Sequence, residues 1–531
     1  MKSAPMTTPV LPLLRLTIAL CFSMGAALAA DKVVTVAYPS DFQSLDPAIG
    51  YDVQNWPVEH ALFVTLLTYD NGTTLKPWGA TDLGQVSKDG KTYTFKLRKG
   101  IAFEDGEPTD AASYKYAFER ILNPKTKSPQ GGKTGWFGNL VGADAFLAGK
   151  GKDVSGIKII DPYTLQFQLS APDRTFLNVL ATPFASAVPR KAVEKWGSDF
   201  SHHVVANGPF LLQSWTPGQK AVLVKNPKYF DAKNVGLDRI EFQVGISEQV
   251  SMLRAQRGQV DVLGNGIPSA QFVQISSDPK YKPYIKSLVQ VGVEYVFMNT
   301  QKAPFDNKLV RQAVSAALDR TRMVQLVNGR GKVTGQILPP GMPGYDASVP
   351  APKADVAKAT ALLQQSGYKQ TAPITFITTS DEPGPKIAQA VQQQLAAIGM
   401  KVDIKALPGA EYINTITTPG SAAIGFSGWF QDYPDPSDFL DVLFEAGYYQ
   451  PGGFNLAGYK VPGVDTQLKA LRGQPLAQAL PGYQKVQKQI LADNPWVPLY
   501  NPVQYSFVNP RVTGMLVHPV WTYVYQDWNL K

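Results

Sequence analysis

The densest group of residues able to do chemistry is the stretch GWFQDYPDP at 428–436, with Asp438 just beyond it. Asp435 and Asp438 could act as the acid and base pair of a glycosidase, but an acidic pair in a loop indicates little without a groove around it. The preceding residues, GFSG at 425–428, approach a nucleophile elbow, yet Trp429 stands where Gly-x-Ser-x-Gly needs its last glycine. The stretch therefore favours a binding segment over a catalytic one.

The rest of the sequence offers little other chemistry. Its histidines, at positions 60, 202, 203 and 518, lack the spacing that places two zinc ligands on one helix face. Neither a phosphate-binding loop nor a dinucleotide fingerprint is present. We therefore expect no catalytic residues, no metal and no cofactor, and an enzyme is the less favoured class.

The elements before this stretch are those of a parallel sheet. An apolar strand at 374–378 leads to a helix carrying Ile387, Val391 and Leu395, and Gly399 separates that helix from a second strand at 402–407. A further apolar run at 422–426 leads directly into 428–436. Because open α/β sheets bind ligands in loops beyond the carboxyl ends of their strands, we expect 428–436 to be such a loop.

The first third of the chain gives a second pair of local predictions. Asp89 and Gly90 separate Val86 from an alternating strand through Leu97, which indicates a hairpin with a positive φ at Gly90. Thr109 or Asp110 can then cap a helix that ends before Pro124. Strands and helices alternate throughout, so the fold class is mixed α/β.

The first thirty residues have the pattern of a secretory signal peptide. Lys2 and Arg15 precede an apolar run of about ten residues, which ends in ALA at 27–29. We expect cleavage near Ala29, with an unlipidated mature protein beginning at or close to Ala30. The only cysteine, Cys21, would be discarded with the signal, because the residue before it is not the small one that a lipoprotein signal needs.

Chain length, cysteine content and net charge further limit the classes of protein that fit the sequence. A chain of 531 residues predicts two or three domains, and a mature protein without cysteine has no disulfides. The formal charge of +9 becomes +7 without Lys2 and Arg15 (9 − 2), and it is spread along the chain. No block of like charges points to nucleic acid, and no second apolar run reaches the length of a membrane span.

An ordered set of blocks resembles the family 5 extracytoplasmic solute-binding proteins, the oligopeptide, dipeptide and nickel receptors of ABC importers. The oligopeptide receptors are the most similar in pattern. The blocks are SLDP at 44–47, LKPW at 75–78, DGKTYTFKLR at 89–98, FEDG at 103–106, NGPF at 207–210, KNPKY at 225–229, NT at 299–300, PFD at 304–306, VRQA at 310–313 and LDR at 318–320.

The resemblance implies a two-lobed periplasmic-binding-protein fold with two hinge crossings and an additional domain inserted in the first lobe. After a signal peptide at 1–30, the first lobe would combine 31–72, 187–288 and 505–531. The additional domain would be 73–186, and the second lobe 289–504.

The resemblance also implies ligand-binding residues. In the family's peptide receptors, the aspartate of a Gly-Trp-x-x-Asp segment holds the peptide's N-terminal ammonium, and Gly428, Trp429 and Asp432 match it. Asp432 could instead cap the turn at 433–436, and Trp429 could be a core residue rather than a pocket wall. Tyr500 falls near a position that such receptors use for the ligand backbone.

The sequence also departs from the family pattern. Phe426, a further expected ligand contact, stands where an oligopeptide receptor has an arginine for the ligand carboxylate. The loop at 380–383, where dipeptide receptors offer an arginine, has none. The expected function is a monomeric periplasmic receptor that binds a peptide or related amine-bearing solute and delivers it to the membrane permease of an ABC importer. A receptor for a metal chelate, an opine or a sugar, and an exported hydrolase, remain the alternatives.

Overall fold

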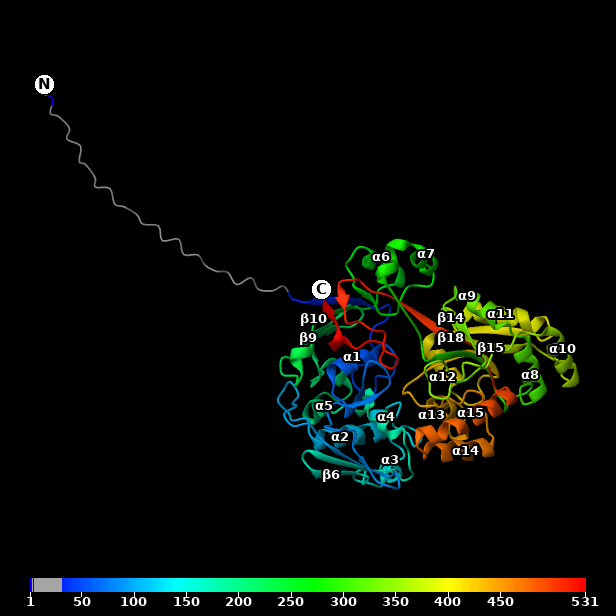
Figure 1. Ribbon diagram of the computed structural model, residues 1–531, viewed down its shortest axis with the longest axis horizontal. Helices are drawn as coiled ribbons and strands as arrows, with labels where there is room; N and C mark the ends of the chain where they lie inside the picture. Colours follow the sequence, from blue (N-terminus) through cyan, green and yellow to red (C-terminus); the bar gives the residue numbers. More distant parts are fainter. Residues whose placement is uncertain (2, 4–30) are drawn as a thin grey trace. The chain divides into compact units, whose positions relative to one another are not determined.

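The computed structural model describes residues 1, 3 and 31–531, and Lys32–Lys531 form one compact unit (Figure 1). The signal peptide, its cleavage near Ala29 and Cys21 lie outside the described residues. Among the helices that are described, none combines the length and the apolarity needed to cross a bilayer.

One sheet has five strands in the order β11-β1-β10-β9-β8. β1 is parallel to β10 and β11, whereas β8, β9 and β10 are antiparallel. The strands are β1 (Val33–Ala37), β8 (Phe210–Thr216), β9 (Lys220–Lys225), β10 (Arg239–Gln243) and β11 (Val262–Leu263). Buried and partly exposed residues alternate along β10, as expected for a strand with one core face. Helix α1 (Asn55–Leu62), which is buried along its whole length, packs near β8.

A smaller antiparallel sheet has the order β4-β5-β7-β6. Its strands are β4 (Gln85–Val86), β5 (Thr92–Lys96), β6 (Ile157–Asp161) and β7 (Thr164–Gln168). The predicted hairpin is confirmed, since β4 pairs with β5 and Gly90 has φ +67°. The predicted helix is α2 (Ala111–Leu122), and Asp110 rather than Thr109 caps it, by accepting from the backbone N–H groups of Ala112 and Ser113.

The largest sheet has seven strands, in the order β12-β18-β13-β17-β15-β16, with β14 paired to β18. They are β12 (Ile285–Val289), β13 (Gly292–Met298), β14 (Gly331–Val333), β15 (Ile374–Thr379), β16 (Val402–Leu407), β17 (Ile424–Phe430) and β18 (Trp496–Phe507). The predicted β-α-β unit is confirmed, because β15 and β16 are parallel and α11 (Gly384–Ala396) connects them.

Two segments join the five-stranded and seven-stranded sheets: β12, which leads into β13, and β18. β12 pairs with the second half of β18, while β13 and β14 pair with its first half. Beyond β18, Val508 bridges to Val262 of β11, so the chain runs from the seven-stranded sheet to the edge of the five-stranded one. Figure 1 shows β18 as a long arrow between these regions.

The remaining elements complete both sides. The further helices are α3 (Ala143–Leu147), α4 (Phe176–Val179), α5 (Arg190–Trp196), α6 (Glu248–Gln256), α7 (Phe272–Ser277), α8 (Lys308–Ala317), α9 (Arg320–Leu326), α10 (Val356–Gln365), α12 (Gly409–Ile416), α13 (Ser437–Phe444), α14 (Pro462–Arg472) and α15 (Leu476–Asp493). Two short ribbons pair β2 (Leu67–Tyr69) with β3 (Leu75–Pro77), and β19 (Val512–Thr513) with β20 (Asn529–Leu530).

The position of the 428–436 stretch differs in part from the prediction. Gly428, Trp429 and Phe430 are the last residues of β17, paired with β13, and the loop begins only at Gln431. Cross-strand packing extends the strand beyond the apolar run, because Trp429 packs with buried residues of the core below the sheet. The loop that follows ends at α13, six residues later.

Candidate functional site

Asp432 lies at the start of the loop that follows β17, on the side of the molecule that contains the seven-stranded sheet. It contacts the other side, which contains the five-stranded and four-stranded sheets. Its Oδ2 atom accepts a hydrogen bond of 2.6 Å from the hydroxyl of Tyr51, 381 residues earlier in the chain. Tyr51 is held by a cluster of rings, with centroids 5.7–6.1 Å from its own, contributed by Trp56, Trp136 and Phe184. The ring cluster therefore positions the hydroxyl that orients the carboxylate.

A cavity of about 180 Å³ opens beside this carboxylate, and we call it the Asp432 cavity. Residues from four separate parts of the chain line it: Tyr51, Asp52, Val53 and Trp56; Gly428–Asp432; Phe454; and Val520–Thr522. Aromatic rings make up much of the wall, and its charged side chains are two aspartates. This composition fits a small ligand group with apolar parts and a positive charge.

Asp432 has no cationic partner among the described residues. Burial raises the pKa of Asp432 to about 7, and the hydrogen bond from Tyr51 opposes that shift only in part. Asp438 lies next to it, and burial together with the charge of Asp432 raises the pKa of Asp438 well above its usual range. A cation that entered the Asp432 cavity would stabilise the ionised form of both acids.

The turn after Asp432 is capped by other residues. The backbone N–H of Ser437 donates to Asp435 Oδ1 at 3.0 Å, and the backbone N–H of Asp432 donates to Asp438 Oδ2 at 2.9 Å. The carboxylate of Asp432 accepts instead from Tyr51. This geometry does not support the capping role that the sequence left open for Asp432.

Trp429 and Phe426 occupy different surroundings. Trp429 lines the Asp432 cavity and packs on Phe454 with ring centroids 4.9 Å apart, and its contact with a ligand stays a prediction. Phe426 is buried in a different core, on the opposite face of the sheet from Trp429, and its carbonyl accepts a 2.6 Å hydrogen bond from the Tyr412 hydroxyl. Phe426 does not line the Asp432 cavity, and its ligand contact stays a prediction.

Tyr500 lines a second and larger cavity of about 360 Å³, which we call the Glu294 cavity. It shares Val53, Phe430 and Thr522 with the Asp432 cavity, so the two spaces adjoin. The charged side chains along its wall are Glu248, Glu294, Glu382 and Arg330. Tyr500 and Asp432 therefore face neighbouring parts of one space.

Glu294 and Arg330 were not among the residues predicted from the sequence. Burial alone raises the pKa of Glu294 to about 7. Arg330 donates to the Val327 carbonyl and to the hydroxyl of Ser269, and burial lowers the pKa of this arginine. A glutamate within the apolar strand GVEYVFM at 292–298 was the available signal for Glu294. Arg330 and Tyr51 lie in loops that give no comparable signal.

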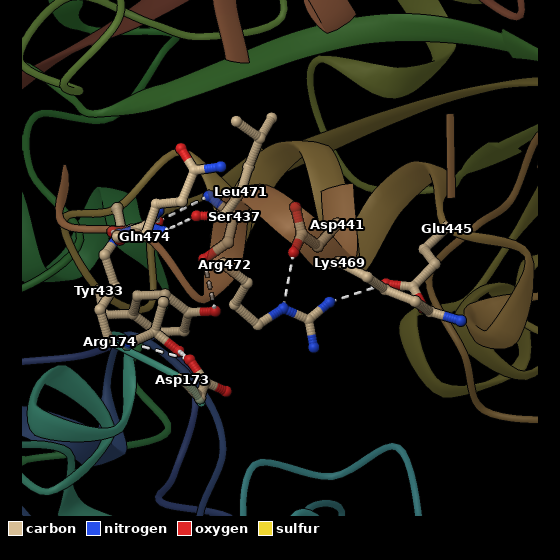
Figure 2. Close-up of polar contacts among 12 residues, drawn as sticks. Asp173, Arg174, Tyr433, Ser437, Asp441, Glu445, Lys469, Leu471, Arg472 and Gln474 are labelled. Carbon is tan, nitrogen blue, oxygen red and sulfur yellow. Dashed lines mark hydrogen bonds and ion pairs between the residues drawn. The ribbon is translucent and has the colours of Figure 1, made fainter. Parts of the chain in front are cut away.

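Arg174 makes a second contact across the molecule, on the other side of Asp432. Its guanidinium binds Asp435 in a bidentate manner, at 3.0 Å through Nε and 2.7 Å through Nη2. Nearby, Arg472 pairs with Asp441 and Glu445, as Figure 2 shows, and Asp173 approaches from the facing segment. Asp435, Asp441 and Glu445, unlike Asp432, have cationic partners within the chain.

Among the described residues, no group of three or more histidine, cysteine or acidic side chains is arranged to hold a metal ion. The donors that converge on the two cavities are carboxylates, amides and hydroxyls distributed over both sides. This arrangement suits the binding of an organic solute.

Residues 74–450 match the family described as bacterial extracellular solute-binding proteins, family 5 Middle. The chain is 29% identical over 526 residues to the probable D,D-dipeptide-binding periplasmic protein DdpA of Escherichia coli (strain K12), covering 97% of each chain. It is 28% identical over 508 residues to the periplasmic oligopeptide-binding protein OppA of the same organism, covering 92% of this chain and 91% of that protein.

The fold also matches solved structures over most of the chain. The structure of OppA from Burkholderia pseudomallei superposes with a TM-score of 0.80 and 26% identity, over 95% of this chain and 100% of that one. The names of these relatives point to different ligands, an oligopeptide in one case and a D,D-dipeptide in another.

Proposed function

Because this chain belongs to the family 5 bacterial extracellular solute-binding proteins, we propose that it is a periplasmic receptor for peptides or closely related amine-bearing solutes. It holds the solute between its two lobes and delivers it to the membrane permease of an ABC importer. The family consists of solute-binding proteins and not of enzymes. The solute class and the permease are the parts that we propose.

The observation that carries the proposal is the carboxylate of Asp432, which faces a cavity and lacks a cationic partner among the described residues. An enclosed anion of this kind is stabilised by an ammonium group, because a charge-assisted hydrogen bond is about twice as strong as a neutral one. Tyr51 fixes the carboxylate so that one oxygen is held by the hydroxyl. The aromatic wall then suits the rest of an N-terminal residue.

We further propose that the lobes follow the division 31–72, 187–288 and 505–531 for the first, with the additional domain at 73–186, and 289–504 for the second. The four-stranded sheet at 85–168 lies entirely within the proposed additional domain, which supports this division. Two hinge crossings leave closure as the way to exclude water from a bound solute. β12 to β13 and β18 would be those crossings.

The proposal predicts that peptides co-purify with the native protein. Native mass spectrometry of protein purified from the periplasm without refolding should show added masses of short peptides, which denaturation releases. The Asp432→Ala variant, purified in parallel, should carry far less peptide, since it lacks the ammonium's partner. Added masses that belong to sugars or metal chelates, or that are equal in both proteins, would contradict the peptide assignment.

A further inference from the structure

Glu294 is an ionisable residue on a strand whose other side chains are apolar. On β13 it pairs with Gly428 on one side and with Tyr500 of β18 on the other. Residues 292, 294, 296 and 298 share one face of the strand, and Val296 and Met298 belong to the buried core. Glu294 stands where that core ends and the Glu294 cavity begins.

Gly428 makes the space that the carboxylate of Glu294 occupies. A Cβ atom at position 428 would lie 2.6–2.8 Å from the carboxyl carbon and oxygens of Glu294, closer than real Cβ atoms approach other atoms. Gly428 has no left-handed φ that would otherwise require glycine. The glycine that opens the Gly-Trp-x-x-Asp segment therefore admits an acid from the neighbouring strand.

Within residues 31–531, no cationic side chain pairs with the carboxylate of Glu294. Burial is the one influence on its pKa, so neither a nearby cation nor a hydrogen-bond donor stabilises its ionised form among the described residues. Arg330 lies in the same cavity, but its pKa responds to Tyr500, Glu248, Glu382 and Tyr505 rather than to Glu294. An enclosed carboxylate without such a partner is unfavourable, and a ligand cation would reverse that.

The charge of the whole space points the same way. The charged residues that line the two adjoining cavities are Asp52, Glu248, Glu294, Glu382 and Asp432, against one cation, Arg330, which gives a formal charge of −4 (1 − 5) when every acid is ionised. The full chain carries +9. The acids are thus concentrated where a solute would lie, so the site selects cationic solutes.

We infer that Glu294 is a second cation-binding carboxylate, and that the preferred solutes are peptides with a lysine or arginine side chain for Glu294 in addition to the ammonium held by Asp432. This inference rests on the proposed function. Gly428 lies beside Glu294, and four residues to Asp432 span at most about 14 Å of extended chain. A lysine at the second or third position of a peptide reaches about 10–13 Å from the N-terminal nitrogen, which fits this span.

The test is calorimetry with four tripeptides that have free N-termini: Ala-Lys-Ala, Ala-Ala-Lys and the same two with norleucine in place of lysine. Norleucine keeps the aliphatic stem and removes the charge. For at least one position, lysine should bind the wild type about tenfold tighter or more than norleucine. Glu294→Gln should lose this preference while it binds the norleucine peptides as the wild type does, which also shows that it is folded.

Glu248→Gln is the matched control, because it removes an exposed carboxylate from the same cavity and should keep the preference for lysine. Norleucine and lysine peptides that bind the wild type equally would overturn the inference and leave the peptide receptor intact. A lysine preference that survives in Glu294→Gln would overturn it as well. If none of the four peptides binds, the peptide assignment itself fails, and the inference fails with it.

Discussion

The space between the two sides of this protein has two regions, which differ in whether the chain supplies cations for their acids. A cavity of about 300 Å³ near Arg472 is lined by Lys133, Lys469 and Arg472 and by Asp173, Asp441 and Glu445, so its charges balance. The adjoining Asp432 and Glu294 cavities have five acids and one arginine. Where the chain supplies both charges, the contact is complete without a solute. Where acids outnumber cations, we propose that the ligand supplies the missing positive charge.

The contrast is sharpest within one loop. Asp432 and Asp435 are three residues apart, yet Asp435 is bound by two nitrogens of Arg174 and Asp432 by a neutral hydroxyl. Asp435 is 2% exposed and Arg174 only 13%. Asp435 therefore joins the two sides of the molecule, whereas we propose that Asp432 is left for the solute.

Among the tests of this comparison, the largest change in stability is expected for substitution of Asp435. Asp435→Asn leaves the mostly buried guanidinium of Arg174 without its anion, and breaking a buried pair by removing one partner costs about 3–5 kcal/mol. Thermal unfolding of the ligand-free variant should show a clear loss of stability. Arg174→Gln should cause a similar loss, and the double variant should lose less than the sum of the two.

The same change at Asp432 should act in the opposite direction. Asp432→Asn removes a carboxylate that burial disfavours, so the ligand-free protein should gain roughly 1–3 kcal/mol of stability at pH 8. The measurement is the same thermal unfolding, with Asp435→Asn beside it. Two variants that both lose stability to a similar degree would show that the two acids serve one structural purpose.

Affinity should depend on pH through Asp432. The pKa of about 7 in the ligand-free protein means that binding an ammonium requires loss of a proton below pH 7. Affinity for a bound tripeptide should then fall by up to about tenfold for each pH unit below 7 and level off above it. Asp432→Asn should flatten the profile measured by calorimetry between pH 5 and 8.

Stability of the ligand-free protein should change with the opposite sign. The folded state binds this proton more tightly than the unfolded state, so the contribution of Asp432 to stability rises as the pH falls from about 7 towards 4. The difference in stability between the wild type and Asp432→Asn should therefore shrink over this range. A difference that does not vary with pH would contradict the raised pKa.

The sequence predicted what depends on local pattern. Asp89 and Gly90 marked a hairpin, Asp110 capped its helix, and strand, helix and strand at 374–407 formed a parallel unit, because each signal lies within a few residues of its effect. The Gly-Trp-x-x-Asp segment could be found because its residues are consecutive. The extent of β17 was misjudged, since its pairing with β13 is not local.

The remaining parts of the site come from pairs that are distant in the chain. Tyr51 and Asp432 are 381 residues apart, and Arg174 and Asp435 are 261 apart, so no local spacing connects them. Glu294 becomes part of the site only through its register opposite Gly428. The sequence shows Glu294 as a charged residue within an apolar strand. The cavity beside it, however, depends on the pairing of β13 with β17 and β18.

The measurement that tests the account most directly is calorimetry of one bound peptide, with its amine free or acetylated, on the wild type and on Asp432→Ala. If Asp432 holds the ammonium, acetylation should weaken binding to the wild type by about 2–5 kcal/mol, or roughly 30-fold to several thousandfold. The variant has already lost this interaction, so acetylation should cost it far less. An equal acetylation penalty in both proteins would show that Asp432 does not bind the amine.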